Sequence, residues 1–439
     1  MLLSLTIENW GPFKDATEFW MIPFPKLAQH KGRPVPLSKY RMKVLPIAAL
    51  FGANASGKTN LFSAVEFARD FVLNGLLLSG RIQRRPYVFE DAYAVKPTRF
   101  EWNFFAGGSL YDYVFSVSDE RVTYERLTKI LTKTEEILFE RNDQTFTGKL
   151  FTNADARDSA YSTPGHVLFL SKLIDERFDG VQGIERFFRS IRVIGSDLQN
   201  KALAVREPHS QLAYGLRQLQ TGIHELSSAP AYLDTLERGA RESLLELLYR
   251  HPGKKFEISA ADHTRLIGRF DAAAHHIIVE KRLLEHRTDH GRRLLSPQEE
   301  SSGTRRLLSL LPQLQQLVSN PEPGIVFIDD LDEGLHPLLV KKILSDFMSL
   351  LDGSKQSQLI FSCRSTELLD QELFRRDEIW LSDRNADNSS CSLRPLTSFV
   401  DENGKYIRFD KVIRRDYLNG VYGGIPRFSK DNVFVRPQE

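Results

Sequence analysis

The sequence has few cysteines and no long apolar run. Only two of its 439 residues are cysteine, Cys363 and Cys391, and their spacing excludes a zinc ribbon or a disulfide framework. Two isolated thiols are typical of a protein of the reducing cytosol. Apolar stretches such as residues 44–51 are far shorter than the about 20 residues that span a bilayer, and residues 1–10 do not form a secretory signal. We therefore expect a soluble, cytoplasmic protein without a membrane partner.

A large net charge is also missing. Lys and Arg number 59 and Asp and Glu number 57, which leaves a formal net charge of +2. No overall field would therefore draw the chain to nucleic acid, and any phosphate contact must come from a local patch. With 41% hydrophobic residues, the chain is long enough for two or three cores or for one large interrupted α/β core.

A glycine-bearing segment follows the apolar residues 44–51, which predict a strand buried on both faces. Residues 52–59 fit the pattern G-x-x-x-x-G-K-[ST], and a helical pattern comes next. In such a loop, backbone amides turn toward phosphate oxygens, Lys58 reaches the β and γ phosphates, and the Thr59 hydroxyl ligates Mg²⁺. A turn that merely joins strand to helix does not explain Lys-Thr at this place. The predicted nucleotide-binding residues here are Gly52, Asn54, Ser56, Gly57, Lys58, Thr59 and Asn60.

A second apolar strand, within residues 324–328, ends at two aspartates. The carboxyl edge of such a sheet is where a P-loop site needs a carboxylate near Mg²⁺, and Asp329 suits that role. Asp330 could polarise the attacking water. Two adjacent aspartates after a strand also fit a helix N-cap or an Asx turn.

Residues 300–307, Glu-Ser-Ser-Gly-Thr-Arg-Arg-Leu, and residues 329–337, Asp-Asp-Leu-Asp-Glu-Gly-Leu-His-Pro, resemble the ATPase core of the ABC superfamily in its SMC-like branch. More narrowly, the chain resembles stand-alone ABC-type ATPases of bacterial anti-phage defence systems. That group includes the RloA-type proteins, the PARIS ATPase subunit and the ATPase half of the overcoming-lysogenisation-defect (OLD) family. Residues 7–13 and 417–426 also resemble segments of this group, so the likeness covers nearly the whole chain.

The resemblance implies an α/β fold, a P-loop NTPase of ABC type with a mixed central sheet, an antiparallel β subdomain and a helical insertion. We expect residues 1–130 to form the N-terminal part of the ATPase core, with the P-loop and an antiparallel meander. Residues 131–290 are expected to be a mostly helical insertion or lid with some core strands, and residues 291–439 the C-terminal part of the core with signature, Walker B and tail.

A signature loop at the start of a helix is a further implication. Ser301 and Gly303 match the serine and second glycine of Leu-Ser-Gly-Gly-Gln, and Ser302 and Thr304 complete the loop. It would contact a γ-phosphate held by the P-loop of another copy, so that ATP joins the chains in a sandwich dimer or a higher homo-oligomer. On the residues alone, the same serines fit a plain helix N-cap.

Two positions depart from the family pattern. Asp330 stands where a catalytic glutamate is usual, and Arg364 stands where a switch histidine is usual. An arginine cannot shuttle a proton, but it can stabilise γ-phosphate charge. Lys58, Asp330 and Arg364 are therefore the expected catalytic residues, with slow turnover. No Q-loop glutamine is recognisable, and Ser171 is only a positional candidate for that role.

Two basic neighbourhoods could contact DNA phosphates. The first spans residues 281–306 and the second residues 408–415. Because acids such as Glu280, Glu285 and Asp289 are interleaved in the first, a solvated, salt-bridged face is favoured there.

The favoured function is a sensor or scaffold subunit of an anti-phage defence system, with ATP and Mg²⁺ as cofactors. It would hold or activate a separate effector, such as a TOPRIM or HNH nuclease, in response to DNA or a phage protein. The alternatives are an SMC-like DNA-repair ATPase and an OLD-type ATPase that works with a nuclease. Residues 365–439 are too few for an appended TOPRIM domain, and no sustained heptads predict a long coiled coil.

Overall fold

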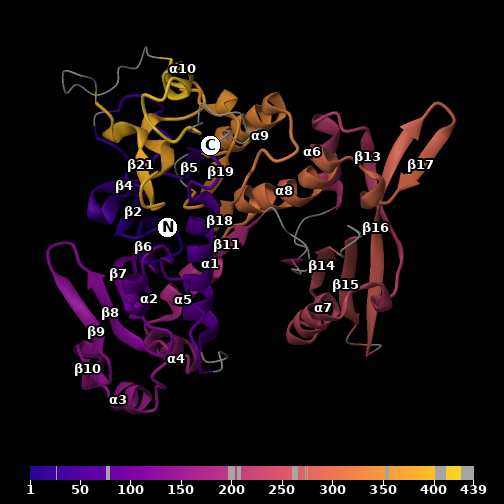
Figure 1. Cartoon of the computed structure of the whole chain (residues 1–439). Helices are drawn as coiled ribbons and strands as arrows, with labels where there is room; N and C mark the ends of the chain where they lie inside the picture. Colours follow the sequence, from indigo (N-terminus) through magenta and orange to yellow (C-terminus); the bar gives the residue numbers. More distant parts are fainter. Residues whose placement is uncertain are drawn as a thin grey trace, which may run out of the picture. The chain divides into compact units, whose positions relative to one another are not determined.

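The chain folds into two compact units (Figure 1). The computed structural model describes residues 1–25, 27–75, 80–195, 203–204, 209–259, 265–271, 273, 275–351, 355–400 and 412–426. Unit 1 comprises Met1–Val193, Pro323–Asp329 and Leu351–Glu439, and unit 2 comprises Ile194–Glu322 and Asp330–Leu350.

Unit 1 contains a mixed six-stranded sheet with the order β11-β18-β19-β5-β20-β21. Its strands are β5 (Ile47–Gly52), β11 (Ile191–Ile194), β18 (Ile325–Ile328), β19 (Gln358–Cys363), β20 (Ile379–Arg384) and β21 (Cys391–Pro395). Strands β18, β19, β5 and β20 are parallel, and β21 runs antiparallel to β20. Every residue of β18 and β19 is buried, as the continuous apolar runs predict for strands covered on both faces.

A seven-stranded antiparallel sheet forms the second layer of unit 1, in the order β10-β9-β8-β7-β6-β1-β2. It consists of β1 (Leu2–Glu8), β2 (Thr17–Trp20), β6 (Thr98–Ala106), β7 (Ser109–Val117), β8 (Val122–Ile130), β9 (Glu135–Asn142) and β10 (Thr145–Thr147). In β6 buried and half-buried residues alternate strictly, as the period of a strand requires. The expected α/β fold, with its mixed sheet and antiparallel subdomain, is confirmed.

Helix α1 (Lys58–Asn74) contacts both sheets of unit 1. The ring of Phe62 packs edge-on against Phe327 of β18, and Phe71 contacts Phe115 of β7. The shorter elements of the unit are β3 (Val35–Leu37), β4 (Met42–Val44), α2 (Asp91–Val95), α3 (Ala154–Tyr161), α4 (Phe169–Asp175), α5 (Gln182–Ser190) and α10 (Ile413–Leu418). One apolar core therefore fixes the P-loop helix from both sides.

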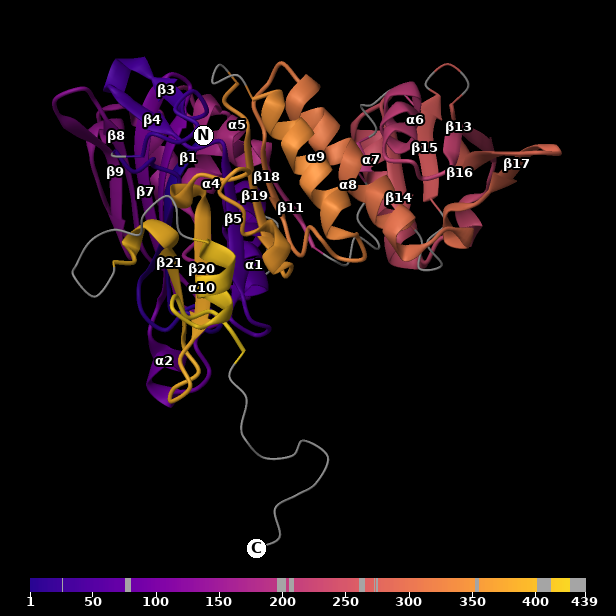
Figure 2. The ribbon, with the colours of Figure 1, turned by 90° about the horizontal axis from the view of Figure 1, so that it is seen from above.

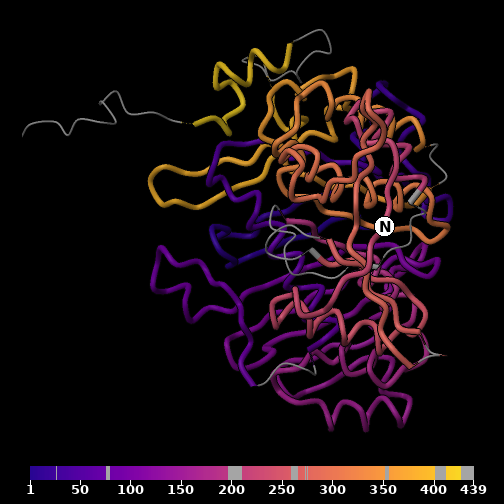
Figure 3. Tube along the Cα trace, turned by 90° about the vertical axis from the view of Figure 1, so that its right-hand side faces the viewer, coloured from indigo at the N-terminus to yellow at the C-terminus, as the bar shows by residue number. Residues whose placement is uncertain are grey.

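Unit 2, traced in pink to orange in Figure 3, is built on an antiparallel sheet with the order β12-β14-β15-β16-β13, to which β17 adds beside β16. Its strands are β12 (Leu203–Ala204), β13 (Ile223–Pro230), β14 (Lys255–Ser259), β15 (Arg265–Asp271), β16 (His276–Thr288) and β17 (Gly291–Leu295). Its helices are α6 (His209–Gln218), α7 (Arg238–Arg250), α8 (Ser302–Ser319) and α9 (Pro337–Ser349). The apolar side of α7 packs on β14 and β15, with Leu244 and Leu248 fully buried.

Helix α8 continues through Pro312. Proline lacks the N–H that would bond the carbonyl of Leu308 four residues earlier. Arg265 of β15 donates to that carbonyl at 3.1 Å, and its other terminal nitrogen donates to Ser309 Oγ at 2.6 Å. The arginine thus satisfies the carbonyl that the proline leaves open and ties the sheet to the helix.

The structure differs from one expectation. Residues 131–290 are not mostly helical, because strands β9 to β16 alternate there with helices α3 to α7. Residues 302–319 and 337–349 belong to unit 2, whereas residues 323–329 and 351–439 belong to unit 1. The short apolar run at residues 167–170 leads into α4. Short apolar runs fit a strand or a buried helix equally well, and only packing decides between them.

Among the described helices, none combines the length and apolarity of a membrane span.

Gln358 joins the two sheets of unit 1. Its side-chain amide donates to the carbonyls of Leu2 and Leu45 at 2.9 and 3.0 Å and accepts from the Leu2 N–H at 2.6 Å, and the residue is fully buried. Replacing it by leucine leaves three buried backbone groups without partners, each at a cost of about 1–3 kcal/mol.

We expect Gln358→Leu to lower the guanidinium midpoint of unfolding markedly, and the same change at the exposed Gln182 to leave it nearly unchanged. Circular dichroism during denaturation measures both midpoints. Equal midpoints for the two variants would contradict a joining role for Gln358.

Candidate functional site

The P-loop connects the end of β5 to the start of α1, as predicted. Gly57 has φ +102°, and a Cβ there would lie 3.0 Å from Cys391 Cβ and 3.2 Å from the ring of Phe13. A Cβ on Gly52 would lie 2.4 Å from the carbonyl oxygen of Ser382. Gly57 is therefore required by its backbone conformation, and Gly52 is required by close packing.

Lys58 is buried in this loop with its ammonium group turned back on the loop itself. Its Nζ donates to the carbonyls of Gly52 and Ala53 at 2.7 and 2.9 Å. Ser56 Oγ is also buried, and it has no hydrogen-bond partner within the described part of the chain. A curled loop with a buried amine and an unbonded hydroxyl fits a phosphate group. Asn54 and Ala55 at the tip are exposed.

Asp329 connects the loop to the neighbouring strands. Thr59 Oγ1 donates to one of its carboxylate oxygens, Oδ2, at 2.6 Å, and the hydroxyl of Ser362 donates to the other, Oδ1. The strands β18, β19 and β5 are parallel neighbours, so their carboxyl ends meet at one edge of the sheet. An alcohol and a carboxylate oxygen are the hard ligands that Mg²⁺ takes from a protein beside substrate phosphates. The predicted pair Thr59 and Asp329 therefore fits a magnesium ion.

Ser362 was not among the predicted site residues. The available signal was a polar residue inside the otherwise apolar stretch 359–363, where a buried hydroxyl needs a partner. That partner turns out to be Asp329, and it comes from a strand 33 positions away in sequence.

The N-terminal segment supports the first turn of α1. Trp10 Nε1 donates to the carbonyl of Asn60 at 3.2 Å, and Gly11 packs closely against the Asn60 side chain. Residues 7–13 thus hold Asn60 and the first turn of α1 in place.

Strands β20 and β21 support the loop from another side. Ser382 Oγ donates to the Ser56 carbonyl at 2.6 Å, and the Cys391 thiol lies against the Ala55 carbonyl. Burial raises the pKa of Cys391 to about 11, so the thiol is neutral at physiological pH. The tail segment continues this support, because the hydroxyl of Tyr417 donates to the carbonyl of Gly424, which packs against β20.

Arg364 is exposed directly after the last residue of β19. It therefore lies at the edge of the sheet that carries Asp329. The positional candidate Ser171 lies instead inside α4, where its buried hydroxyl donates to the Phe71 carbonyl. Ser171 is therefore a structural residue.

The predicted signature loop belongs to unit 2. Ser301 caps α8, and its Oγ accepts from the Thr304 N–H at 3.1 Å. Ser301 and Ser302 are exposed. A Cβ on Gly303 would lie 2.8 Å from the carbonyl oxygen of Gly334, so only glycine allows the two loops to approach. The N-cap interpretation is correct, and it leaves the exposed face of the helix start available for a ligand.

Asp330 also belongs to unit 2, although it follows Asp329 directly. It has φ +44°, and its carbonyl accepts from the buried guanidinium of Arg306 at 2.9 Å. His336 caps α9 through its ring Nδ1, which accepts from the Leu338 N–H at 3.2 Å, and so has a structural role.

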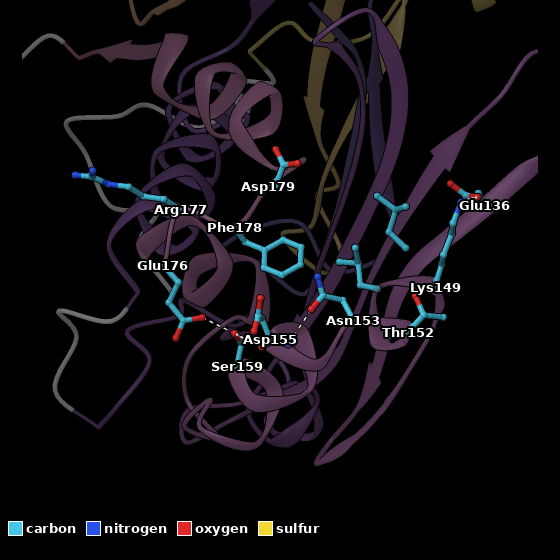
Figure 4. Close-up of a pocket in the computed structure, with 12 residues that line it drawn as sticks. Glu136, Lys149, Thr152, Asn153, Asp155, Ser159, Glu176, Arg177, Phe178 and Asp179 are labelled. Atoms are coloured by element: carbon cyan, nitrogen blue, oxygen red, sulfur yellow. Dashed lines mark hydrogen bonds and ion pairs between the residues drawn. The ribbon is translucent and has the colours of Figure 1, made fainter.

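A cavity of about 640 Å³ lies in unit 1 between β9 and α3 (Figure 4). The Phe178 ring points into it, and the carboxylates around it include Asp155 and Glu176, the latter bonded to Ser159. None of the predicted site residues lines this cavity.

A family model decides the identity of this fold. The family described as "AAA domain, putative AbiEii toxin, Type IV TA system" matches residues 47–370, which include the P-loop, Asp329 and Arg364. The chain belongs to this family. Together with the geometry of Lys58, Thr59 and Asp329, this membership makes the AAA-domain chain an ATPase of the P-loop type. Among curated proteins, none matches the sequence.

Several solved structures are similar to this AAA-domain chain. An SMC head domain from Thermotoga maritima is 14% identical with a TM-score of 0.35, covering 90% of this chain and 98% of that chain. An Smc head bound to the C-winged helix domain of ScpA is 13% identical with a TM-score of 0.39, covering 92% and 98%. These values are too low to assign a function.

Ser362 fixes the orientation of the Asp329 carboxylate, so a Mg²⁺ ion held by Asp329 would be sensitive to this serine. We expect Ser362→Ala to raise the Mg²⁺ concentration needed for tight binding of a fluorescent ATP analogue by about tenfold or more. Ser362→Thr keeps the hydroxyl and should retain most of the wild-type affinity, and Ser162→Ala, at an exposed site of unit 1, should have no effect. An unchanged Mg²⁺ titration for Ser362→Ala would contradict the assignment.

Proposed function

We propose that the chain binds ATP and Mg²⁺ at the P-loop of unit 1 and hydrolyses ATP slowly, as an ABC-type ATPase. The contact between Thr59 Oγ1 and Asp329 Oδ2 carries the proposal, because it brings the two predicted metal ligands together from elements 270 positions apart. Lys58 holds the β and γ phosphates, and the loop amides and the start of α1 add to the positive field.

The functional assembly contains at least two copies. Supporting this, the exposed start of α8 in unit 2 offers hydroxyl groups, amides and a helix dipole, which is the chemistry that binds a γ-phosphate. Residues Ser301 to Thr304 of one copy would then complete the ATP-binding site of another copy, in a dimer or a higher homo-oligomer.

Slow turnover follows from the residues at the catalytic positions. Asp330 is one methylene shorter than glutamate, so an attacking water must be held differently. Arg364 offers positive charge to the γ-phosphate but no proton transfer. The ATP-bound assembly is therefore the working state.

In the cell, this assembly acts in the cytoplasm as the sensor or scaffold of an anti-phage defence system and controls a separate effector, such as a TOPRIM or HNH nuclease. The toxin–antitoxin wording of the family description and the defence-protein resemblance of residues 300–307 and 329–337 support this setting. DNA or a phage protein is the proposed trigger.

The assembly is tested with two variants. Lys58→Ala should abolish binding of a fluorescent ATP analogue and any ATP-dependent oligomer, since the buried ammonium group is lost. Asp330→Ala should bind ATP normally and retain the oligomer longer than wild type. Mass photometry with and without Mg²⁺-ATP measures both. An oligomer unaffected by ATP and by Lys58→Ala would contradict the sandwich.

The effector is tested by co-purification of the tagged chain with the product of the neighbouring gene. Association that requires ATP and is lost in Lys58→Ala supports the sensor role. Purified chain that cleaves DNA with Mg²⁺ and no partner would instead favour the OLD-type alternative.

A further inference from the structure

The basic neighbourhood at residues 281–306 separates into two parts in the structure. In one part the guanidinium groups are bonded within unit 2. Arg282 pairs with Glu257 at 2.7 Å, Arg305 donates to the Glu300 carbonyl at 2.7 Å, and Arg306 donates to the Asp330 carbonyl at 2.9 Å. These three arginines stabilise unit 2 itself. In the second basic neighbourhood Arg414 pairs with Glu367, whereas residues 408 and 411 lie outside the described residues.

The other part is the turn of the β16–β17 hairpin, residues 287–293, which we call the ribbon tip. Strand β16 pairs with β15 as far as Lys281 and with β13 as far as His286, so Arg287 and Thr288 pair with β17 alone. Figures 1 and 2 both show the hairpin extending past strands β13 to β15. The ribbon tip is thus a two-stranded ribbon without a covering layer from its own sheet.

The ribbon tip is basic and exposed along its whole length. It contains three arginines and a single acid, Asp289. Arg287 stands directly opposite Arg292 in the ladder, and like charges at opposite positions destabilise a hairpin. Arg292 reaches the mostly buried Glu285 at 3.4 Å. No ion pair joins Arg287 or Arg293 to another of the described residues.

The arginines face both sides of the ribbon. Opposite residues of a ladder share a face, so Arg287 and Arg292 lie on one face, and the next residue, Arg293, lies on the other. A guanidinium group binds phosphate oxygens with two parallel hydrogen bonds. A two-stranded ribbon also fits the major groove of B-DNA, which has a phosphate wall on each side.

We propose that the ribbon tip binds the phosphate backbone of duplex nucleic acid through Arg287, Arg292 and Arg293. Charge on both faces suits a groove with two phosphate walls better than the single surface of an acidic protein. Because the whole chain is nearly neutral, this local cluster would supply the attraction. The proposal goes beyond ATP binding and does not depend on it.

The test compares two triple variants that remove the same charge from unit 2. One replaces the three ribbon-tip arginines by alanine. The control replaces the exposed Arg238, Arg241 and Arg250 of α7, which are already paired with acids. Fluorescence anisotropy of a labelled DNA duplex about two helical turns long measures affinity across a range of salt concentrations, without nucleotide. Thermal melts and ATP-analogue binding confirm that both variants are folded.

We expect the ribbon-tip variant to bind the duplex about tenfold or more weakly than wild type at moderate salt. The slope of log affinity against log salt concentration should be smaller in magnitude by up to about three, one for each phosphate contact. The control should match wild type. Wild-type protein that does not bind the duplex, or equal losses in the two variants, would overturn the proposal. Binding of poly-glutamate but not of duplex through the ribbon tip would also overturn it, in favour of an acidic protein partner.

Discussion

The hydrogen bonds of the Asp329 carboxylate are the interactions on which the candidate nucleotide site depends. It accepts from Thr59 of the P-loop helix and from Ser362 of the intervening strand, and it is almost completely buried. A buried carboxylate is stable only when its oxygens are bonded, so the two hydroxyl groups stabilise it at the proposed metal site. The parallel order β18-β19-β5 is what brings these three residues together.

The surroundings of the P-loop show how much of unit 1 maintains that arrangement. Trp10 holds the first turn of α1, Ser382 holds the Ser56 carbonyl, and Cys391 closes the space beside Gly57. These contacts come from the start of the chain and from its last third. The left-handed conformation of Ala55 strains the loop, and packing from several elements keeps it in one conformation.

Unit 2 has a different electrostatic organisation. Arg305 and Arg306 bond the carbonyls of Glu300 and Asp330, and Arg282 pairs with Glu257. The hairpin of β16 and β17 differs, since its turn gathers three arginines and a single acid, Asp289, and among the described residues only Arg292 reaches a further acid, Glu285. Charge that is costly for the hairpin itself indicates a surface shaped for a ligand.

The sequence by itself predicted the candidate nucleotide site: Gly52 to Thr59, the buried strand before it and the aspartate pair after residue 328 follow from local spacing and apolar runs. It also indicated the antiparallel meander, through short runs rich in aromatic residues and valine that are broken by Gly107 and Gly108. Tertiary structure alone decided that Ser362 orients Asp329 and that the interval 131–290 contains a sheet. It also decided which arginines of residues 281–306 are bonded within unit 2 and which lie at the exposed hairpin turn. Hydrophobic periodicity indicates which face of a helix or strand is buried. Contacts between residues distant in sequence form only when the strands take their order in the sheet.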